Sequence, residues 1–387
     1  MFDYANYARQ MRHELHQCPE IGFDLPKTLA IVRRELDAMG IEYTEKFGTS
    51  SVVATINPGK AFTIGLRGDM DALPIQENSS NPYPSKIPGQ MHACGHDVHT
   101  AQMLAVTRQL NDRKGELRCT VKILFTPAEE YITPGCKEMA ENGVMDDIDV
   151  ILACHVDPAI PVGQIRLTEG GINANSLGIR VEFFGKAAHA AQQEKGVDAI
   201  RMAVEAYMAM ELMVAREVAG KSPCILNIGA FNGGTTNNVV CDYAKLFLTN
   251  RTYSDELTEY VERRIREICE NIAKTAGGRA EVTRTKLLPY VINHPKVTQL
   301  TRSAAEKALG KENVKEFVRS MDGEDFSFLC RRKPGCMFRL GIRNEEDPGT
   351  HAPLHNERFN VDETCFEAGI AVFVQFVLDN QDGIDFS

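Results

Sequence analysis

Apolar stretches of strand length alternate with helical stretches through the first part of this chain, and this alternation restricts the possible folds. Strand-length stretches lie at residues 62–66, 121–125 and 150–154, and a helical stretch lies at about residues 100–110. The alternation predicts βαβ units in an α/β domain, with a mostly parallel sheet covered by helices. Ligands bind such sheets at the carboxyl ends of the strands, so residues that follow these strands are candidates for a functional site.

The pattern changes near residue 176, where apolar residues alternate strictly with other residues, as expected for a half-exposed sheet (Leu177, Ile179, Val181, Phe183). Two helical stretches and further strands follow before α/β character returns near residue 289. We therefore predict a discontinuous domain of residues 1–175 and 289–387, interrupted by a smaller α+β domain of residues 176–288.

Composition excludes several classes of protein. The 387 residues include 43 basic and 53 acidic side chains, so the net charge of −10 predicts no binding to nucleic acid or to anionic membranes. The longest apolar runs, such as residues 369–378, are about half the ~20 residues of a membrane-spanning helix. The N-terminus is polar, and the eleven cysteines lack the spacing of a disulfide framework. These features predict a cytoplasmic protein with reduced thiols.

Residues 92–99 contain the densest group of possible metal ligands: three histidines, one cysteine and one aspartate. Cys94 and His96 are two residues apart, so in extended backbone a thiolate and an imidazole can converge on one ion. An alternative is that Cys94 is a nucleophile activated by a histidine, although this arrangement needs one base and one orienting group rather than several ligands.

Acidic pairs follow two of the predicted strands. Asp69 and Asp71 are alternate residues and share one face of extended chain, where they could orient a ligand imidazole or bind a cation. Glu129 and Glu130 are adjacent, so their side chains point apart. One of the two carboxylates can therefore bind a metal while the other acts as a general base on water.

Two isolated histidines, His155 and His355, complete a set of sulfur, nitrogen and oxygen ligands that is large enough for two divalent ions (Cys94, His96, Glu130, His155, His355). Two ions ~3.5–4 Å apart can activate water and polarise a carbonyl, which suits amide hydrolysis. His189, in the second domain, carries little functional signal by itself.

These motifs, in this order, resemble the aminoacylase and carboxypeptidase-type metallopeptidase family. Within it they are most similar to the N-acyl-amino-acid amidohydrolases, which include hippurate hydrolases, indole-acetyl-amino-acid hydrolases and N-acetyldiaminopimelate deacetylases. The resemblance covers nearly the whole chain and rests on seven segments (residues 12–20, 69–74, 92–97, 127–130, 155–158, 323–326 and 353–356).

The resemblance implies a catalytic domain with a centre of two divalent metal ions (Mn, Zn, Co or Ni), and an inserted lid domain that also forms a homodimer. Glu129 would be the general base, and Asp71 would orient a ligand. The metal ligands implied are the five residues already grouped above (Cys94, His96, Glu130, His155, His355).

In the lid, the resemblance implies that His189 holds the developing oxyanion and that Asn238 and Arg251 position the substrate. The sequence departs from the family pattern at three places that concern specificity more than catalysis. Residues 190–193 lack the usual Pro and second His after His189, residues 131–134 are bulkier than the usual Gly-rich stretch, and Cys241 replaces a common Pro.

We predict a metal-dependent amidohydrolase that cleaves small N-acyl-amino acids to a carboxylate and a free amino acid. The first alternative is a dipeptidase or carboxypeptidase that uses the same centre on short peptides. An alternative of another class is a non-catalytic protein that binds metal or amino acids on the same scaffold.

Overall fold

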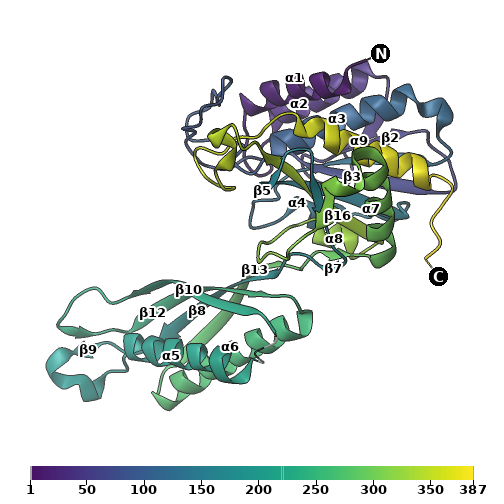
Figure 1. Ribbon diagram of the computed structural model, residues 1–387. Helices are drawn as coiled ribbons and strands as arrows, with labels where there is room; N and C mark the ends of the chain where they lie inside the picture. Colours follow the sequence, from purple (N-terminus) through teal and green to yellow (C-terminus); the bar gives the residue numbers. More distant parts are fainter. Residues whose placement is uncertain (1, 219, 221, 387) are drawn as a thin grey trace. The chain divides into compact units, whose positions relative to one another are not determined.

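A computed structural model describes residues 2–218, 220 and 222–386 of the protein. The chain forms two compact units (Figure 1). The first contains the chain up to Ile172, Val291–Val318 and the chain from Asp325 on, and the second contains Asn173–Tyr290 and Arg319–Glu324. The predicted insertion, residues 176–288, falls inside the second unit, whereas the short segment 319–324 was not predicted to belong to it.

The first unit is built on an eight-stranded sheet with the strand order β1-β2-β4-β3-β5-β16-β6-β15. Its four central strands are parallel: β4 (Thr120–Thr126), β3 (Thr63–Asp69), β5 (Val150–Pro161) and β16 (Gly335–Arg343). The outer strands are β1 (Glu42–Thr44), β2 (Val52–Ile56), β6 (Ile165–Leu167) and β15 (Val314–Glu316). This mostly parallel sheet confirms the predicted α/β fold class.

Helices cover both faces of this sheet. One face packs on α1 (Tyr4–His16), α2 (Pro26–Ala38), α3 (His96–Asp112), α7 (Pro295–Leu309) and α9 (Cys365–Asn380), and the other packs on α4 (Gly135–Glu141) and α8 (Ser327–Cys330). Alternate residues of β5 enter different cores: Leu152 lies in the first, and Ile151 and Ala153 lie in the second. A strand buried on both faces explains the continuous apolar run in the sequence.

The second unit is a four-stranded antiparallel sheet with the order β10-β12-β8-β13. Its strands are β8 (Asn175–Phe184), β10 (Cys224–Gly233), β12 (Tyr243–Thr252) and β13 (Arg279–Leu288). Two helices, α5 (Ala199–Glu217) and α6 (Asp255–Thr275), pack on one face of the sheet and bury the alternating residues of β8. Asp198 and Ser254 cap their N-termini by accepting hydrogen bonds from backbone N–H groups.

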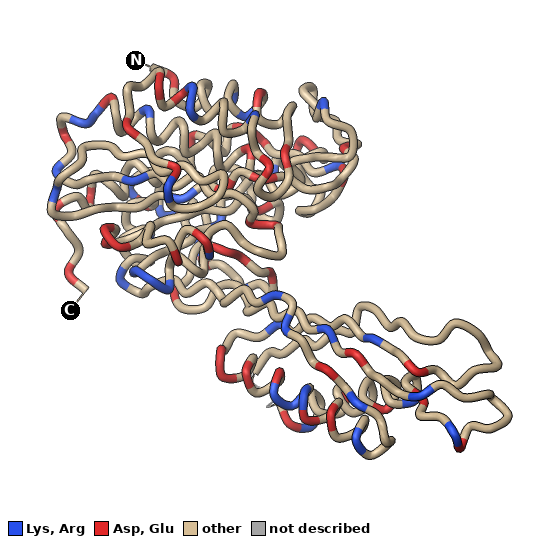
Figure 2. The backbone as a smooth tube through the Cα atoms, turned by 180° about the vertical axis from the view of Figure 1, so that it is seen from behind, with Lys and Arg blue, Asp and Glu red and all other residues tan. Residues whose placement is uncertain are grey.

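Short elements complete the two units. A two-stranded ribbon pairs β9 (Ala188–His189) with β11 (Val239–Val240), and another pairs β7 (Gly170–Gly171) with β14 (Ile292–Asn293). Short 3-10 helices lie at Lys114–Glu116, Ala190–Lys195, Lys311–Asn313 and Pro348–His351. Acidic and basic residues are interspersed along both units (Figure 2). Of the helices in the described residues, none combines the length and the apolar character that crossing a bilayer requires.

Candidate active site

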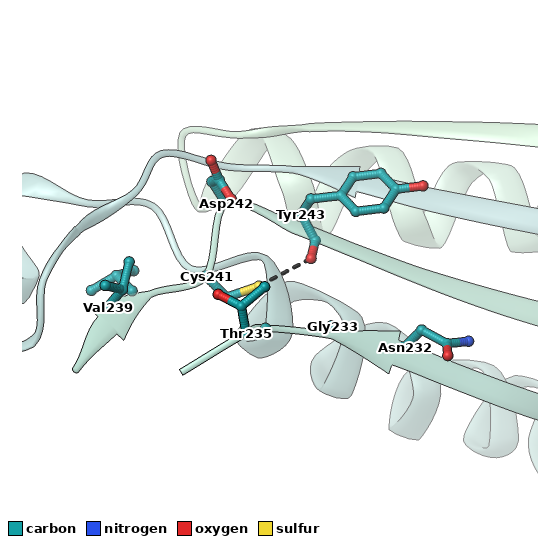
Figure 3. Close-up of a pocket in the computed structure, with 9 residues that line it drawn as sticks. Asn232, Gly233, Thr235, Val239, Cys241, Asp242 and Tyr243 are labelled. Carbon is teal, nitrogen blue, oxygen red and sulfur yellow. Dashed lines mark hydrogen bonds between the residues drawn. The ribbon is translucent and has the colours of Figure 1, made fainter. Parts of the chain in front are cut away.

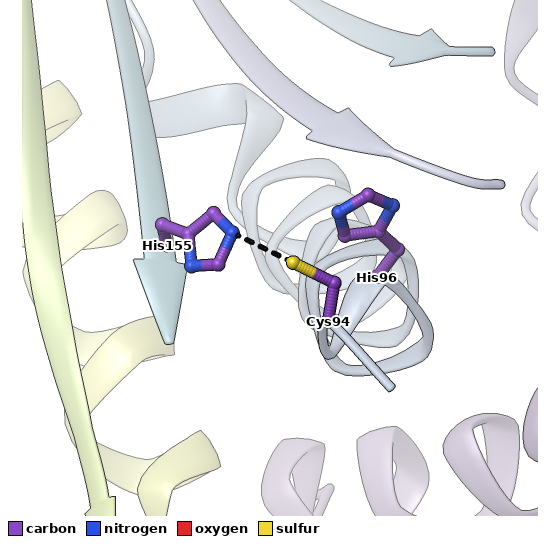
Figure 4. Close-up of side chains that lie close together, drawn as sticks. All are labelled: Cys94, His96 and His155. Atoms are coloured by element: carbon purple, nitrogen blue, oxygen red, sulfur yellow. Dashed lines mark hydrogen bonds between the residues drawn. The ribbon is translucent and has the colours of Figure 1, made fainter. Parts of the chain in front are cut away.

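Three of the predicted ligands converge beside the sheet of the first unit (Figure 4). The ligand atoms of Cys94, His96 and His155 all lie within 4.8 Å of one another, and Cys94 Sγ is 3.4 Å from His155 Nε2. His96 is the first residue of α3, and Gly95 before it has a φ of 83°. A Cβ atom on Gly95 would lie 2.4 Å from Val156 Cγ2, so only glycine allows this turn between the two ligands.

Backbone carbonyls orient both imidazole rings. His96 Nδ1 lies 2.8 Å from the carbonyl oxygen of Asp71, and His155 Nδ1 lies 2.7 Å from that of Val156. Because a carbonyl oxygen only accepts, each Nδ1 carries a proton, and in the neutral ring each Nε2 therefore keeps a lone pair. His96 Nε2 is buried and makes no hydrogen bond with any residue that the structure describes. A buried nitrogen of this kind is unfavourable without a partner, and a metal ion would supply one.

The other two predicted ligands form a second group with Cys94. The ligand atoms of Cys94, Glu130 and His355 also lie within 4.8 Å of one another, and His355 Nε2 is 2.9 Å from Glu130 Oε1. His355 adopts a φ of 62°, and its N–H donates to the carbonyl oxygen of Ala93. The structure therefore brings all five predicted ligands together, and Cys94 belongs to both groups.

Asp71 holds the glutamate pair as well as His96. Its carboxylate accepts hydrogen bonds from the backbone N–H groups of Glu129, at 3.0 Å, and Glu130, at 3.2 Å. Its contact with His96 Nδ1 is longer, at 3.4 Å, than the hydrogen bond from that nitrogen to the Asp71 carbonyl oxygen. The Asp71 carbonyl thus orients His96, and the Asp71 carboxylate positions the backbone of Glu129, the predicted base, and of Glu130, a predicted ligand.

Glu129 is 8% exposed, and its carboxylate lies within 4.8 Å of the ligand atoms of His96 and Glu130. The backbone N–H of Asp325 donates to Glu129 Oε1 at 3.3 Å. Asp325 in turn accepts from Arg67 Nη2 at 2.5 Å and from the N–H of Cys136 at 2.9 Å. No role was predicted for Arg67 or Asp325 from the sequence, although a basic residue within an apolar strand is a signal that could have identified Arg67.

The side chains around Cys94 favour a protonated thiol as long as no cation is bound. Burial raises the pKa of Cys94 well above its ordinary value, and the nearby Glu130 carboxylate raises it further. Burial disfavours the protonated ring of His96, but the carboxylate of Asp69 outweighs burial and holds the pKa of His96 well above normal. Burial lowers the pKa of His155. A cation would replace the thiol proton and the Nε2 proton of a charged His96 ring, since metals bind the thiolate and the neutral imidazole.

The N-terminal segment that contributes to the family resemblance anchors the start of α3. Arg12 Nε donates to Asp97 Oδ2 at 3.0 Å, and His16 Nδ1 donates to the same oxygen at 2.7 Å. Both Arg12 and Asp97 are fully buried, and the guanidinium holds the pKa of Asp97 below its usual range despite burial. Asp97 follows His96 directly, so this ion pair joins α1 to the helix turn that carries a predicted ligand.

The predicted substrate-binding residues lie in the second unit. His189 is exposed and pairs with Val239 in the β9–β11 ribbon, and the carbonyl oxygen of Asn238 accepts from the N–H of Ala190 at 3.0 Å. His189 and Asn238 are therefore neighbours. A pocket beside this ribbon is lined by residues of β10, β11, β12 and the connecting loops, Cys241 included (Figure 3).

Arg251 lies far from this ribbon within the same unit. It is near the end of β12, whose first residue is Tyr243, and a strand rises ~3.3 Å per residue, so the two positions are roughly 26 Å apart. Arg251 Nη1 donates to the carbonyl oxygen of Met321, and burial lowers the pKa of its guanidinium. The structure does not bring Arg251 together with His189 and Asn238.

Comparison with known proteins identifies the family of the chain. A model of the peptidase family M20/M25/M40 matches residues 65–379. The chain belongs to this family. An N-acetyl-L-cysteine deacetylase of Bacillus subtilis is 35% identical over 358 residues, which cover 92% of this chain and 83% of that protein. A hippurate hydrolase of Campylobacter jejuni is 30% identical over 382 residues, which cover 98% of this chain and 97% of that protein.

A solved structure agrees with this assignment. The YXEP protein of Bacillus subtilis, described as a dinuclear metal binding peptidase of the M20 family, is 29% identical and superimposes with a TM-score of 0.83. The match covers 98% of this chain and 99% of that chain. These similarities confirm the family predicted from the sequence.

The Arg12–Asp97 ion pair yields a prediction about stability. Replacing Arg12 with Leu leaves the Asp97 charge buried without its guanidinium. We therefore expect the free energy of unfolding of the metal-free protein, measured in urea, to fall by about 3–5 kcal/mol. In the double variant Arg12→Leu/Asp97→Asn the buried Asp97 charge is removed as well, and Glu363, which also pairs with Arg12, keeps its contact with His13, so part of this loss should be recovered. A loss for Arg12→Leu below about 1 kcal/mol would contradict a structural role for the pair.

Proposed function

We propose that this protein is a metal-dependent amidohydrolase that cleaves N-acyl amino acids into a carboxylate and a free amino acid. The observation that carries the proposal is the convergence of the ligand atoms of Cys94, His96 and His155, with His96 Nε2 buried and without a hydrogen bond to any described residue. Membership of a hydrolase family supports it. The relatives described above are named for N-acetylcysteine deacetylation and hippurate hydrolysis, and both substrates are N-acyl amino acids.

The donor set fits two divalent ions. Cys94, His96 and His155 would hold one ion, and Cys94, Glu130 and His355 would hold the other, with the thiolate shared. When bound, such ions polarise the amide carbonyl and acidify a water molecule. Mixed sulfur, nitrogen and oxygen ligands suit Zn, Mn, Co or Ni, and the metal present in the cell also depends on supply.

Glu129 would move the proton. Its carboxylate accepts a proton from the attacking water and later delivers that proton to the leaving amide nitrogen. The N–H of Asp325 keeps Glu129 Oε1 in place. The Asp71 carboxylate fixes the backbone by accepting from the N–H groups of both Glu129 and Glu130. We propose that His189 stabilises the oxyanion and that Asn238 and Arg251 hold the substrate, as parts of lids that close over the site. Because Arg251 lies at the far end of β12 from the ribbon of His189 and Asn238, the ribbon and Arg251 at one site would come from different subunits of the proposed dimer.

Two alternatives predict different behaviour. A dipeptidase or carboxypeptidase would use the same residues on short peptides. A cysteine hydrolase would need Cys94 as a thiolate without metal, but burial raises the pKa of this thiol, and Cys94 belongs to two groups of ligand atoms rather than to a single pair with one base. Both observations favour Cys94 as a metal ligand.

We also propose that the second unit forms a homodimer and that the protein is cytoplasmic. The helix α5 presents an apolar stripe at four-residue spacing, with Val204 46%, Met208 64% and Leu212 58% exposed. The strand β10 lies at an edge of the sheet, where its backbone can pair with another strand. All eleven cysteines are free thiols, as expected in a reducing compartment.

The role of Glu129 yields the second prediction. Glu129→Gln removes the base but keeps the size and the Oε1 acceptor, so metal content and unfolding should match the wild type while kcat falls by about 10²–10⁴-fold. Glu141→Gln, a change at an exposed glutamate of α4, is the matched control and should leave kcat unchanged. A Glu129→Gln enzyme with near-normal kcat would remove Glu129 from this role.

Metal removal and a substrate panel yield the third prediction. Chelation should abolish hydrolysis, and Zn²⁺, Mn²⁺ or Co²⁺ should restore it, because neither the buried thiol nor the imidazoles supply an activated water on their own. On the restored enzyme, kcat/KM should be higher for N-acetyl and N-benzoyl amino acids than for dipeptides with the same C-terminal residue. Higher values for dipeptides would favour the peptidase alternative, and no hydrolysis of either class would favour a binding protein.

The apolar stripe on α5 yields the fourth prediction. Met208→Lys places a charge in the proposed dimer contact, so sedimentation should show monomers where the wild type sediments as a dimer. Glu259→Gln on α6 changes the net charge by the same amount at another exposed position and should leave the dimer intact. A wild-type protein that sediments as a monomer at micromolar concentration would contradict the dimer.

A further inference from the structure

His99 is a buried histidine beside the ligands for which the proposed function has no role. It lies on α3, three residues after His96, and is 1% exposed. Its ring centroid is 5.5 Å from that of His96 and 4.8 Å from that of His155. Asp69, His96 and His99 also bring their ligand atoms within 4.8 Å of one another, so His99 is itself a candidate ligand by proximity.

The hydrogen bonds of His99 argue against metal binding. The backbone N–H of Val156 donates to His99 Nε2 at 3.0 Å, so this nitrogen uses its lone pair to accept. His99 Nδ1 lies 2.6 Å from Asp69 Oδ1, and because the carboxylate accepts, Nδ1 carries the proton. With both ring nitrogens engaged, His99 has no lone pair left for a metal ion.

These bonds place the peptide that positions His155. The N–H of Val156 is held by His99, and the carbonyl oxygen of the same residue accepts from His155 Nδ1 at 2.7 Å. This second bond turns His155 Nε2 toward Cys94 Sγ, at 3.4 Å. The direction in which the ligand nitrogen of His155 points therefore depends on the contact between His99 and Val156.

The contact extends through a buried network to the proposed base. Asp69 Oδ2 pairs with Arg67 Nη1 at 2.7 Å, and Arg67 Nη2 donates to Asp325 Oδ1 at 2.5 Å. The N–H of Asp325 donates to Glu129 Oε1 at 3.3 Å. A chain of hydrogen bonds with one ion pair, between Asp69 and Arg67, thus connects the backbone beside His155 with the carboxylate of Glu129.

We propose that His99 is a positioning residue, held in its Nδ1–H tautomer by Asp69, that fixes the Val156 peptide and thereby aims His155 at the metal. The inference rests on the proposed function, because it assigns a role toward the metal centre of that function. A positioning role differs from a ligand role in what His99 Nε2 does. As a positioning residue, His99 accepts at Nε2 from a backbone N–H, whereas a ligand would bind an ion there.

Two amide variants separate these roles. In His99→Gln the side-chain oxygen can reach the place of Nε2 and accept from Val156, whereas in His99→Asn the shorter amide reaches only the place of Nδ1. We expect His99→Asn to weaken Co²⁺ affinity about 10- to 100-fold, measured by chelator competition, and to change the visible spectrum of the Co²⁺ protein. His99→Gln should stay within a few-fold of the wild type in affinity and keep its spectrum.

A second site tests the tautomer if His99→Asn does not fold. Asp69→Asn has the same shape, but its amide can donate to His99 Nδ1 and so favours the Nε2–H tautomer, which cannot accept from Val156. We expect the same loss of Co²⁺ affinity and the same spectral change. Metal-free unfolding in urea, measured for each variant, separates a loss of affinity from a general loss of stability.

The outcomes distinguish this inference from the proposed function. Equal, large losses of affinity in His99→Gln and His99→Asn would make His99 a ligand and overturn the positioning role. Wild-type affinity in both His99→Asn and Asp69→Asn would overturn it as well. A wild-type protein that fails to bind Co²⁺ would overturn the proposed function, and this inference would fall with it.

Discussion

The site depends on one constraint: two buried imidazoles donate hydrogen bonds from Nδ1 to backbone carbonyls and so turn their Nε2 atoms toward Cys94. For His96 the acceptor is the Asp71 carbonyl, and for His155 it is the carbonyl of Val156. A buried polar atom without a partner costs about 1–3 kcal/mol. His96 Nε2 has no hydrogen-bond partner among the described residues, and a cation between Cys94 and these rings would offset this cost.

Buried ion pairs hold this arrangement from two sides. Arg12 and Asp97 join α1 to the first turn of α3, and Arg67 joins Asp69 to Asp325 beneath the glutamate pair. Buried charges gain little net stability over apolar packing, but their geometry is strict and their removal is expensive. In this protein each pair lies next to a proposed ligand or base, so the ion pairs determine where the reactive groups stand.

The sequence was sufficient to predict the sheet, the family and the five residues that converge, because strand ends in a parallel sheet share one edge and because the residue types are rare in such density. The sequence was not sufficient to predict the contacts that side chains make with backbone atoms. The orientation of His96 by the Asp71 carbonyl and the capture of Val156 by His99 depend on segments that meet only in the tertiary structure.

Element ends show the same limit. We expected the apolar strand to end just before His155, whereas β5 continues to Pro161 because it pairs with β16 beyond that point. A family pattern also names residues without giving the distance between them. Arg251 shows this, because it lies at the far end of β12 from the ribbon that carries His189.

X-ray absorption on protein loaded with two equivalents of Zn²⁺ tests the central claim, a thiolate shared by two ions, most directly. We expect a sulfur shell at ~2.3 Å and a zinc–zinc distance of ~3.5–4 Å, with the sulfur shell absent in Cys94→Ser. A shell of nitrogen and oxygen alone in the wild type, without a second zinc in range, would contradict it.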